Sequence, residues 1–183
     1  MKVLDVVLRA ADILGIKQGV SEFFEDGTDT MRSEAEKLLA CFHLAECSLA
    51  LDYIPLHAEE SLYASDGRVE FSSLQGAPVR ILDVKDVRGD SIAYTVYSNY
   101  IKTESGLVTI HYTYTPNFKT ADEDSSFEPA FAEGLLTYGT LSEYCLGEGL
   151  VAEAAEWERK WKDLIATIYH TAKCKRLGSR RWV

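Results

Sequence analysis

The spacing of hydrophobic and polar positions changes twice along this chain. Towards both ends, apolar residues recur every three or four positions, which is the period of an amphipathic helix. Through the middle, apolar and polar residues alternate, which is the period of a β-strand with one solvated face. This order predicts an α+β fold in which a β-rich segment interrupts a helical body.

The apolar stripes predict four helices that together form a four-helix bundle: residues 3–14, 29–52, 127–146 and 150–170. Gly15 is a plausible residue to end the first helix, and Pro55 stops the second. Pro129 suits the first turn of the third helix. Segment 15–28 contains three glycines and is expected to be a loop.

The middle of the chain predicts strands at residues 68–74, 79–87, 91–102 and 107–115. The last of these places Val108, Ile110, Tyr112 and Tyr114 on one face and polar residues on the other, so we expect an antiparallel sheet with one solvated face. Arg88-Gly89-Asp90 spells an adhesion tripeptide, but a hairpin turn with a positive φ at glycine is the better interpretation.

The expected organisation therefore has three parts. Residues 1–55 and 127–172 form the helical bundle, residues 56–126 form an inserted antiparallel β-sheet region, and residues 173–183 form an extended C-terminal tail. No apolar run approaches the roughly 20 residues that span a bilayer, and no signal-peptide pattern is present at the N-terminus. The four cysteines are scattered without a paired spacing, which suits a reducing cytoplasm.

The charge distribution is uneven. The 183-residue chain has a net charge of −10, which disfavours a general nucleic-acid-binding face. The tail nevertheless contains five cations and no acid: Lys173, Lys175, Arg176, Arg180 and Arg181. Without these five charges the remainder carries −15, so body and tail have opposite signs. Such a division favours head-to-tail contacts between copies, or docking to an acidic partner.

Candidate catalytic groups do not form a recognisable pattern. His43, His57, His111 and His170 are dispersed, without a metal-ligand spacing or a nucleotide-binding, hydrolase or dinucleotide motif nearby. The acidic run at 122–124 lacks the ligand spacing of a calcium loop and is expected to be a solvated loop. We therefore expect that the protein is not an enzyme and that it binds neither a metal ion nor a cofactor.

Several short motifs, taken in order, resemble the head–tail adaptor (connector) proteins of tailed bacteriophages, the group that includes tail tubular protein A. The first two motifs are the Leu4–Gly15 helix, which ends in Leu-Gly, and the Val108–Pro116 strand, which ends in Tyr-x-Pro. The third is the helix start at Phe127–Phe131, followed by Gly134–Gly139. The last two are the Glu143-Tyr144-Cys145 segment, which leads to Glu153-Ala154 and Trp157, and the closing Arg-Arg-Trp. Each motif is degenerate, and the resemblance lies in their order and spacing over most of the chain.

The resemblance implies a structural virion protein at the phage head–tail junction. Such a protein forms a homo-oligomeric ring, typically of twelve copies, that joins the portal protein to a tail nozzle or tail-tube protein. DNA passes through the channel without sequence-specific binding, and no membrane is involved. The protein would be made in the bacterial host cytoplasm. The resemblance also implies that the C-terminal tail contacts the portal.

The tail residues expected to dock on a partner are Lys175, Arg176, Arg180, Arg181 and Trp182. The arginines would pair with acidic side chains, and Trp182 would fill an apolar pocket. A solvated tail, or one that folds back on its own helices, is the alternative. For the whole chain, the alternatives are a small phage- or prophage-encoded protein-binding module, or an enzyme with a pocket that carries no known motif.

Overall fold

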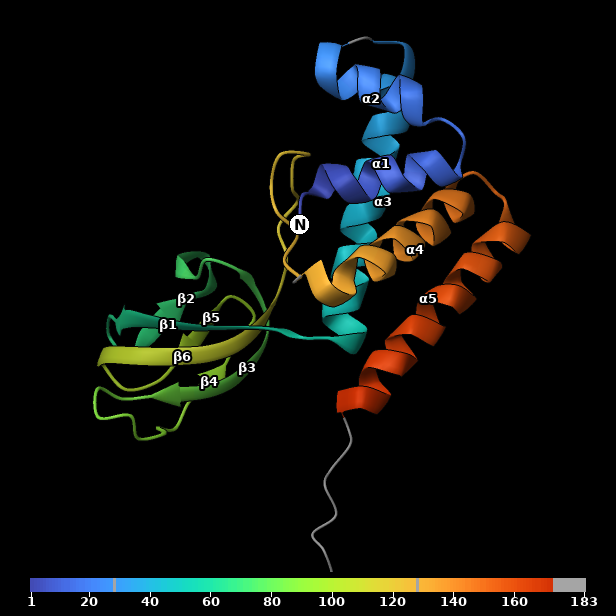
Figure 1. The fold of residues 1–183 in the computed structure, drawn as a ribbon. Coiled ribbons are helices and arrows are strands. Elements are labelled where there is room, and N and C mark those ends of the chain that lie inside the picture. Colours follow the sequence, from blue (N-terminus) through green and yellow to red (C-terminus); the bar gives the residue numbers. More distant parts are fainter. Residues whose placement is uncertain (28, 128, 173–183) are drawn as a thin grey trace, which may run out of the picture. The chain divides into compact units, whose positions relative to one another are not determined.

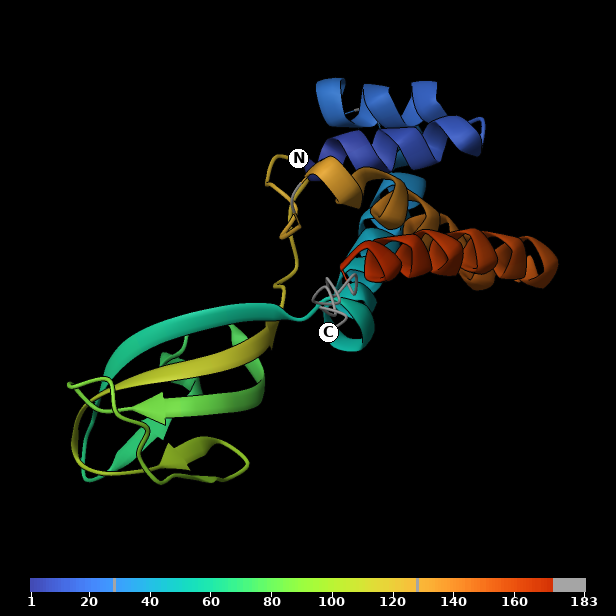
Figure 2. The ribbon, with the colours of Figure 1, turned by 60° about the horizontal axis from the view of Figure 1, so that its bottom comes forward.

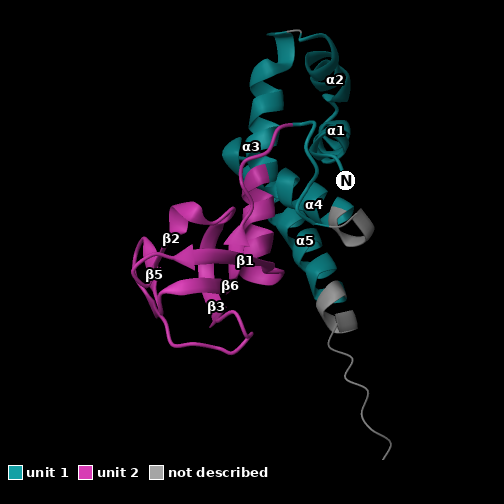
Figure 3. Cartoon of the chain, turned by 90° about the vertical axis from the view of Figure 1, so that its left-hand side faces the viewer, with its two compact units in different colours: residues 1–42, 121–183 teal, residues 43–120 magenta. Residues whose placement is uncertain are grey.

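The structure, a computed structural model, describes residues 1–27, 29–127 and 129–172. The chain divides into two compact units, each considered by itself below (Figure 3). The helical unit comprises Met1–Phe42 and Ala121–Val183, and the β unit comprises His43–Thr120. The predicted C-terminal tail, residues 173–183, lies outside the described residues.

The α+β class is confirmed, but the predicted four-helix bundle is wrong. The described residues contain five α-helices: α1 (Val3–Ile13), α2 (Lys17–Asp26), α3 (Arg32–Ser48), α4 (Pro129–Gly147) and α5 (Val151–Ala172). A short 3-10 turn, η1 (Asp29–Met31), precedes α3 (Figure 1). The β unit contains two small antiparallel sheets instead of one.

The helix missed by the sequence prediction is α2, which occupies the segment expected to be a loop. Gly15 and Gly27 have φ of +75° and +69°, and they follow α1 and α2 in the left-handed conformation that ends helices. Gly19 lies inside α2 at a point where Met31 comes close. A Cβ at this position would lie 2.6 Å from Met31 Cγ, so glycine is the residue that permits the contact. The glycines that suggested a loop therefore mark two helix ends and one close contact.

Helix α1 buries one apolar face, as its spacing predicts. Its buried residues are Val3, Val6, Val7, Ala10 and Ala11. The helix packs on both α2 and α4, as two views show (Figures 1 and 2). An ion pair between Arg9 and Glu133 adds to the α1–α4 contact.

The N-terminal residues are held by the segment that precedes α4. Val3 N–H donates to Glu123 O at 3.0 Å, Leu4 N–H to Ala121 O at 3.0 Å, and Ser125 N–H to Met1 O at 2.8 Å. The Asp124 carboxylate lies 3.2 Å from the Met1 amine, which lowers the pKa of Asp124. The acidic run expected to be a solvated loop thus pairs with the start of the chain. We call this arrangement the N-terminal clasp.

Helix α5 packs along α4 as the second half of a helical hairpin. Its buried residues include Ala154, Trp161 and Ile165. Gly134 of α4 allows a close approach, since a Cβ there would lie 3.3 Å from Leu164 Cδ1. The energetic cost of a glycine within a helix, up to about 1 kcal/mol, is tolerated here because it permits this packing.

The β unit is built from six strands. Their bounds are β1 (Leu56–Ala64), β2 (Arg68–Glu70), β3 (Ala77–Lys85), β4 (Thr95–Val96), β5 (Tyr100–Lys102) and β6 (Gly106–Thr115). One antiparallel sheet has the order β1-β6-β3 and the other has the order β2-β5-β4 (Figure 2). A π-helical turn, η2 (Leu49–Tyr53), leads into β1, and a 3-10 turn, η3 (Phe71–Ser73), follows β2.

A shared apolar core joins the two sheets. It contains Ala64, Val69, Leu74, Val84, Ile101, Val108, Ile110 and Tyr112. The β6 residues of this set are the ones whose alternation predicted an inward face, so that prediction is confirmed. Because both sheets contribute to one core, neither three-stranded sheet has to be stable alone.

The prediction of strands was wrong in three places. The expected strand 68–74 ends at Glu70, and η3 follows it. Strand β1 was not expected, because the inward position Glu60 interrupts its apolar alternation. The expected strand 91–102 is instead the two short strands β4 and β5. The turn at 86–90 matches its prediction: Gly89 has φ of +87°, and Asp86 accepts hydrogen bonds from the backbone N–H groups of Arg88 and Asp90.

Replacing Trp161 should severely destabilise the protein, because the side chain is only 7% exposed and its loss leaves a large cavity. We expect Trp161→Ala to lower the free energy of unfolding by about 3–5 kcal/mol, measured by chemical denaturation. Val151→Ala on the same helix is the control, since Val151 is 65% exposed. An unchanged denaturation midpoint in Trp161→Ala would show that this face of α5 is not part of the core.

Candidate functional site

The docking residues predicted from the sequence, Lys175, Arg176, Arg180, Arg181 and Trp182, all lie outside the described residues. The structure therefore neither brings them together nor separates them. Candidate sites within the described part of the chain lie on the α4–α5 hairpin and in the β unit.

The α4–α5 hairpin turns sharply after Gly147. Gly149 has φ of +77°, a conformation that favours glycine, and Leu150 N–H donates to Cys145 O at 2.8 Å. Ser142 Oγ then donates to Ala154 O at 3.2 Å across the two helices. This turn fixes the register in which α4 residues 142–146 face α5 residues 151–161.

A groove lies between the two helices next to the turn. Its volume is about 210 Å³, and its lining residues are Ser142, Glu143, Leu146, Val151, Ala154, Ala155, Glu158 and Trp161. Apolar side chains dominate the wall nearest the turn, where Leu146 is 57% exposed and Val151 is 65% exposed. Leu150 beside them is also exposed. We call this concave surface the hairpin groove.

The hairpin groove contains two carboxylates from opposite helices. Partial burial raises the pKa of Glu143, and the nearby charge of Glu158 raises it further. Glu158 pairs with Lys162 at 2.6 Å on its own helix. The Glu143 carboxylate thus sits beside apolar side chains and a like charge, an environment that a cation would improve.

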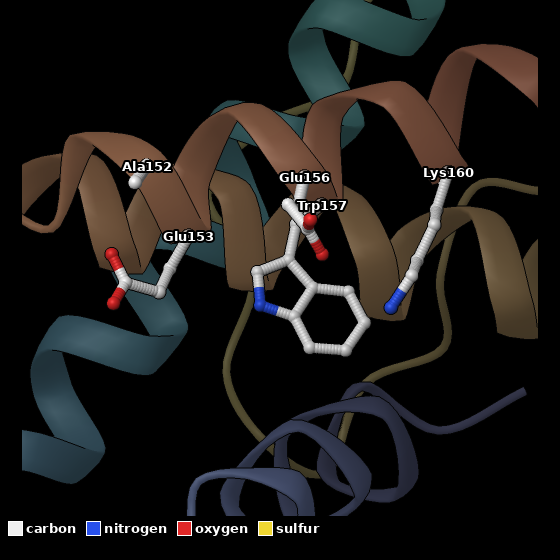
Figure 4. Close-up of a pocket in the computed structure, with 5 residues that line it drawn as sticks. All are labelled: Ala152, Glu153, Glu156, Trp157 and Lys160. Atoms are coloured by element: carbon white, nitrogen blue, oxygen red, sulfur yellow. The ribbon is translucent and has the colours of Figure 1, made fainter.

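The opposite side of α5 carries a second concave surface, shown in Figure 4. It encloses about 360 Å³ and is lined by Ala152, Glu153, Glu156, Trp157 and Lys160. The Lys160 ammonium lies 3.9 Å from the centre of the Trp157 ring, and Tyr138 contacts the same indole with ring centres 5.5 Å apart. Both the Trp157 ring and the Lys160 ammonium therefore already have partners within their own chain.

Helix α3 supports the tip of the hairpin through a polar cluster. The Tyr144 hydroxyl donates to Glu34 at 2.6 Å, and Lys37 lies within 3.1 Å of Glu34 and 2.8 Å of Glu148. Burial and the bond to Glu34 raise the pKa of Tyr144 to about 12. The cluster holds the turn in place and leaves the hairpin groove open.

The β unit contains a polar pocket of about 460 Å³ near the start of β3. Tyr112 donates a hydrogen bond to Glu60, and the backbone N–H of Gln75 donates to the same carboxylate at 3.1 Å. Burial first, and then the bond to Glu60, raise the pKa of Tyr112 to about 12. The phenol therefore stays protonated near neutral pH and acts as a structural donor instead of a base.

The histidines do not converge on one site. His57 and His111 are neighbours on the outer face of one sheet, with ring centres 5.6 Å apart. His43 instead contacts Phe118 and Cys47, and the side chain of His170 is outside the described part. Within residues 1–27, 29–127 and 129–172, no group of three or more His, Cys, Asp or Glu side chains is arranged to hold a metal ion.

The described cysteines are small buried or half-buried side chains. Burial raises the pKa of Cys41 to about 11, and it also raises the pKa values of Cys47 and Cys145. A raised pKa leaves little thiolate at neutral pH, so these thiols are poor nucleophiles. Cys174 lies outside the described residues.

The hairpin groove is the candidate site that sequence reasoning missed. Glu143 and Glu158 lie on different helices, fifteen positions apart in sequence. A pattern within a single helix does not show their proximity. The only signal available in the sequence was the glycine-rich turn at 147–149, which brings the two helices together.

No family model matches the chain, and no curated protein is significantly similar to it. No helix in the described part of the chain is long and apolar enough to cross a membrane.

Removing the Tyr112 hydroxyl should weaken the β unit, because Glu60 then loses its buried partner. We expect Tyr112→Phe to lower the free energy of unfolding by about 1–3 kcal/mol at pH 7. The raised pKa of Tyr112 means that this stabilisation is present below pH 10 and disappears as the pH rises through about 12. The difference between wild type and variant should therefore shrink over that range in denaturation experiments.

Absorbance at 295 nm provides an independent check on the same residue. The alkaline titration of the wild type should show a late component with a midpoint near pH 12, to which Tyr112 and Tyr144 both contribute, and Tyr112→Phe should lose the Tyr112 share of its amplitude. Tyr63→Phe is the control, because Tyr63 is exposed on the outer face of β1. An identical late phase in wild type and Tyr112→Phe would contradict the buried Tyr112–Glu60 bond.

Proposed function

We propose that this protein is a structural adaptor of a tailed bacteriophage. In this role it forms a homo-oligomeric ring at the head–tail junction of the virion, a ring that in the family it resembles typically has twelve copies. The ring joins the portal protein to the tail and provides a channel for DNA. The proposal treats the chain as an assembly component without a catalytic role.

The observation that carries this proposal is the position of the motifs on which the family resemblance rests. The Leu4–Gly15 motif coincides with α1 and the glycine that ends it. The Tyr-x-Pro motif lies at the end of β6, and the third motif opens α4. Three of the motifs that resemble the adaptor family therefore coincide with the beginning or end of a regular element, where they shape the fold.

Charge supports the same role. A channel that passes DNA must avoid retaining it, and affinity for phosphates grows with each cation that is offered. The chain outside its C-terminal segment has a net charge of −15, so it offers little general attraction for DNA. The cationic segment 173–183 is then available for a protein partner, and we propose that the portal is one such partner.

Exposed apolar side chains are a further support. Leu146, Leu150 and Val151 are all exposed at the turn of the hairpin, within a few residues of each other. Clustered exposed apolar groups beside charged ones are typical of protein–protein contact sites. A structural ring protein needs such surfaces on every copy.

The decisive test uses the portal protein encoded in the same genome. We expect the purified chain to co-sediment with portal particles, and a variant lacking residues 174–183 to remain in the supernatant with an unchanged melting temperature. Raising the salt concentration should weaken the wild-type complex, since part of the contact is ionic. The thermal melt is the control that separates lost docking from lost folding.

Two results would overturn parts of this proposal. If the full chain does not co-sediment with portal particles, and stays monomeric or dimeric, a small protein-binding module is the better description. If the truncated chain co-sediments as well as the full chain, residues 174–183 are not the docking segment, although the adaptor role can stand.

A further inference from the structure

The hairpin groove combines an exposed apolar wall with an electrostatically unfavourable carboxylate. Leu146 and Val151 are exposed at one side of the groove, and Glu143 faces the like charge of Glu158 at the other. Neither feature stabilises the isolated chain: exposed apolar area favours burial, and burial together with the charge of Glu158 raises the pKa of Glu143 although Glu158 itself pairs with Lys162. A ligand with cations next to a large apolar group would relieve both.

The chain itself contains a segment of that chemistry. Residues 173–183 include five cations and no acid, and they end in Arg180-Arg181-Trp182-Val183. Arginine forms strong paired hydrogen bonds with carboxylates, and tryptophan and arginine are the residues that contribute most to binding at protein interfaces. The groove and the segment are thus complementary in charge and in apolar character.

We propose, building on the ring of the proposed function, that the hairpin groove of one copy binds the Arg180–Trp182 end of the C-terminal segment from a second copy, while the preceding cations at 173–176 remain for the portal. Arg180 and Arg181 pair with Glu143 and Glu158, and Trp182 covers the wall formed by Leu146 and Val151. The two faces of this contact are different, so each copy can bind one neighbour at its groove and another through its segment. Such a head-to-tail contact builds a ring or a filament.

Chain length favours a second copy over the same copy as the source of the segment. Val151 lies twenty-one residues before Ala172 on α5, which is about 32 Å at 1.5 Å per residue. The ten residues from 173 to 182 span at most about 33–36 Å when fully extended. To reach Leu146 and Val151 of its own chain, the segment would have to turn back at the end of α5 and run along the whole helix. An extended segment is barely as long as the helix, so almost no chain remains to form the turn. A neighbouring copy has no such limit.

Mixing two full-length variants tests this proposal. The groove variant is Glu143→Lys with Glu158→Lys, and the segment variant is Arg180→Ala with Arg181→Ala, so that the two altered surfaces do not attract each other. In sedimentation velocity, the wild type should associate in a concentration- and salt-dependent manner, while each variant alone stays monomeric. An equimolar mixture should form dimers and nothing larger, because it restores one contact, between the intact groove of one variant and the intact segment of the other.

A matched control makes the same charge change on the opposite face of α5. Glu153→Lys with Glu156→Lys alters the surface beside Trp157, so it should associate like the wild type. If the groove variant loses its helical circular dichroism, the milder Glu143→Gln with Glu158→Gln replaces it, and its dissociation constant should rise at least tenfold.

Three outcomes overturn the proposal: a monomeric wild type, a mixture that stays monomeric, or a control variant that loses association as completely as the groove variant. A monomeric mixture together with a groove variant of altered stability would indicate that the segment returns to its own chain. No portal protein is present in the experiment, so failure here is distinct from failure of the adaptor role.

Discussion

The helical unit depends on the N-terminal clasp. Met1 to Leu4 form backbone hydrogen bonds with residues 121–125, which are about 120 positions away in the sequence. These bonds bring α1 onto α4, so a helix from the start of the chain completes a unit whose other helices come from the end. The intervening segment must leave this unit and return, and residues 43–120 form a second compact unit with a core of their own. Strands β1 and β6, through which the chain enters and leaves the β sheets, pair directly, with Leu56 opposite Tyr114.

The helices and strands that could be predicted from the sequence are those in which the spacing of apolar residues is regular from end to end. Helix α1 and strand β6 each have an apolar stripe with few exceptions, and burial follows that stripe. Helices α4 and α5 were also predicted, but burial follows their stripes only in part: Leu150 is exposed, and α4 buries Thr137 and Thr140. Helix α2 was missed because its glycines, read as loop residues, instead cap it and accommodate Met31. Strand β1 was missed because Glu60 faces inward, where it is satisfied by Tyr112 and Gln75. Such partners come from other elements, so local patterns do not reveal them.

The two surfaces of the proposed contact also differ in how far the sequence alone reveals them. The cationic C-terminal segment is evident from composition alone, because five cations without an acid stand out in an acidic chain. The hairpin groove is not evident, because it exists only after the turn at Gly149 brings Glu143 of α4 near Glu158 of α5. One half of the proposed contact is therefore a property of the sequence, and the other half is a property of the fold. Together they describe a protomer with two unlike, complementary surfaces, as a closed ring requires.

The most direct measurement of the central claim, that this chain is a ring-forming adaptor, is electron cryo-microscopy of the portal protein co-expressed with it. We expect a closed ring of copies coaxial with the portal, with neighbouring copies in contact through the hairpin groove and a continuous channel wide enough for duplex DNA. Portal particles without such a ring, or with single copies bound at scattered positions, would contradict it.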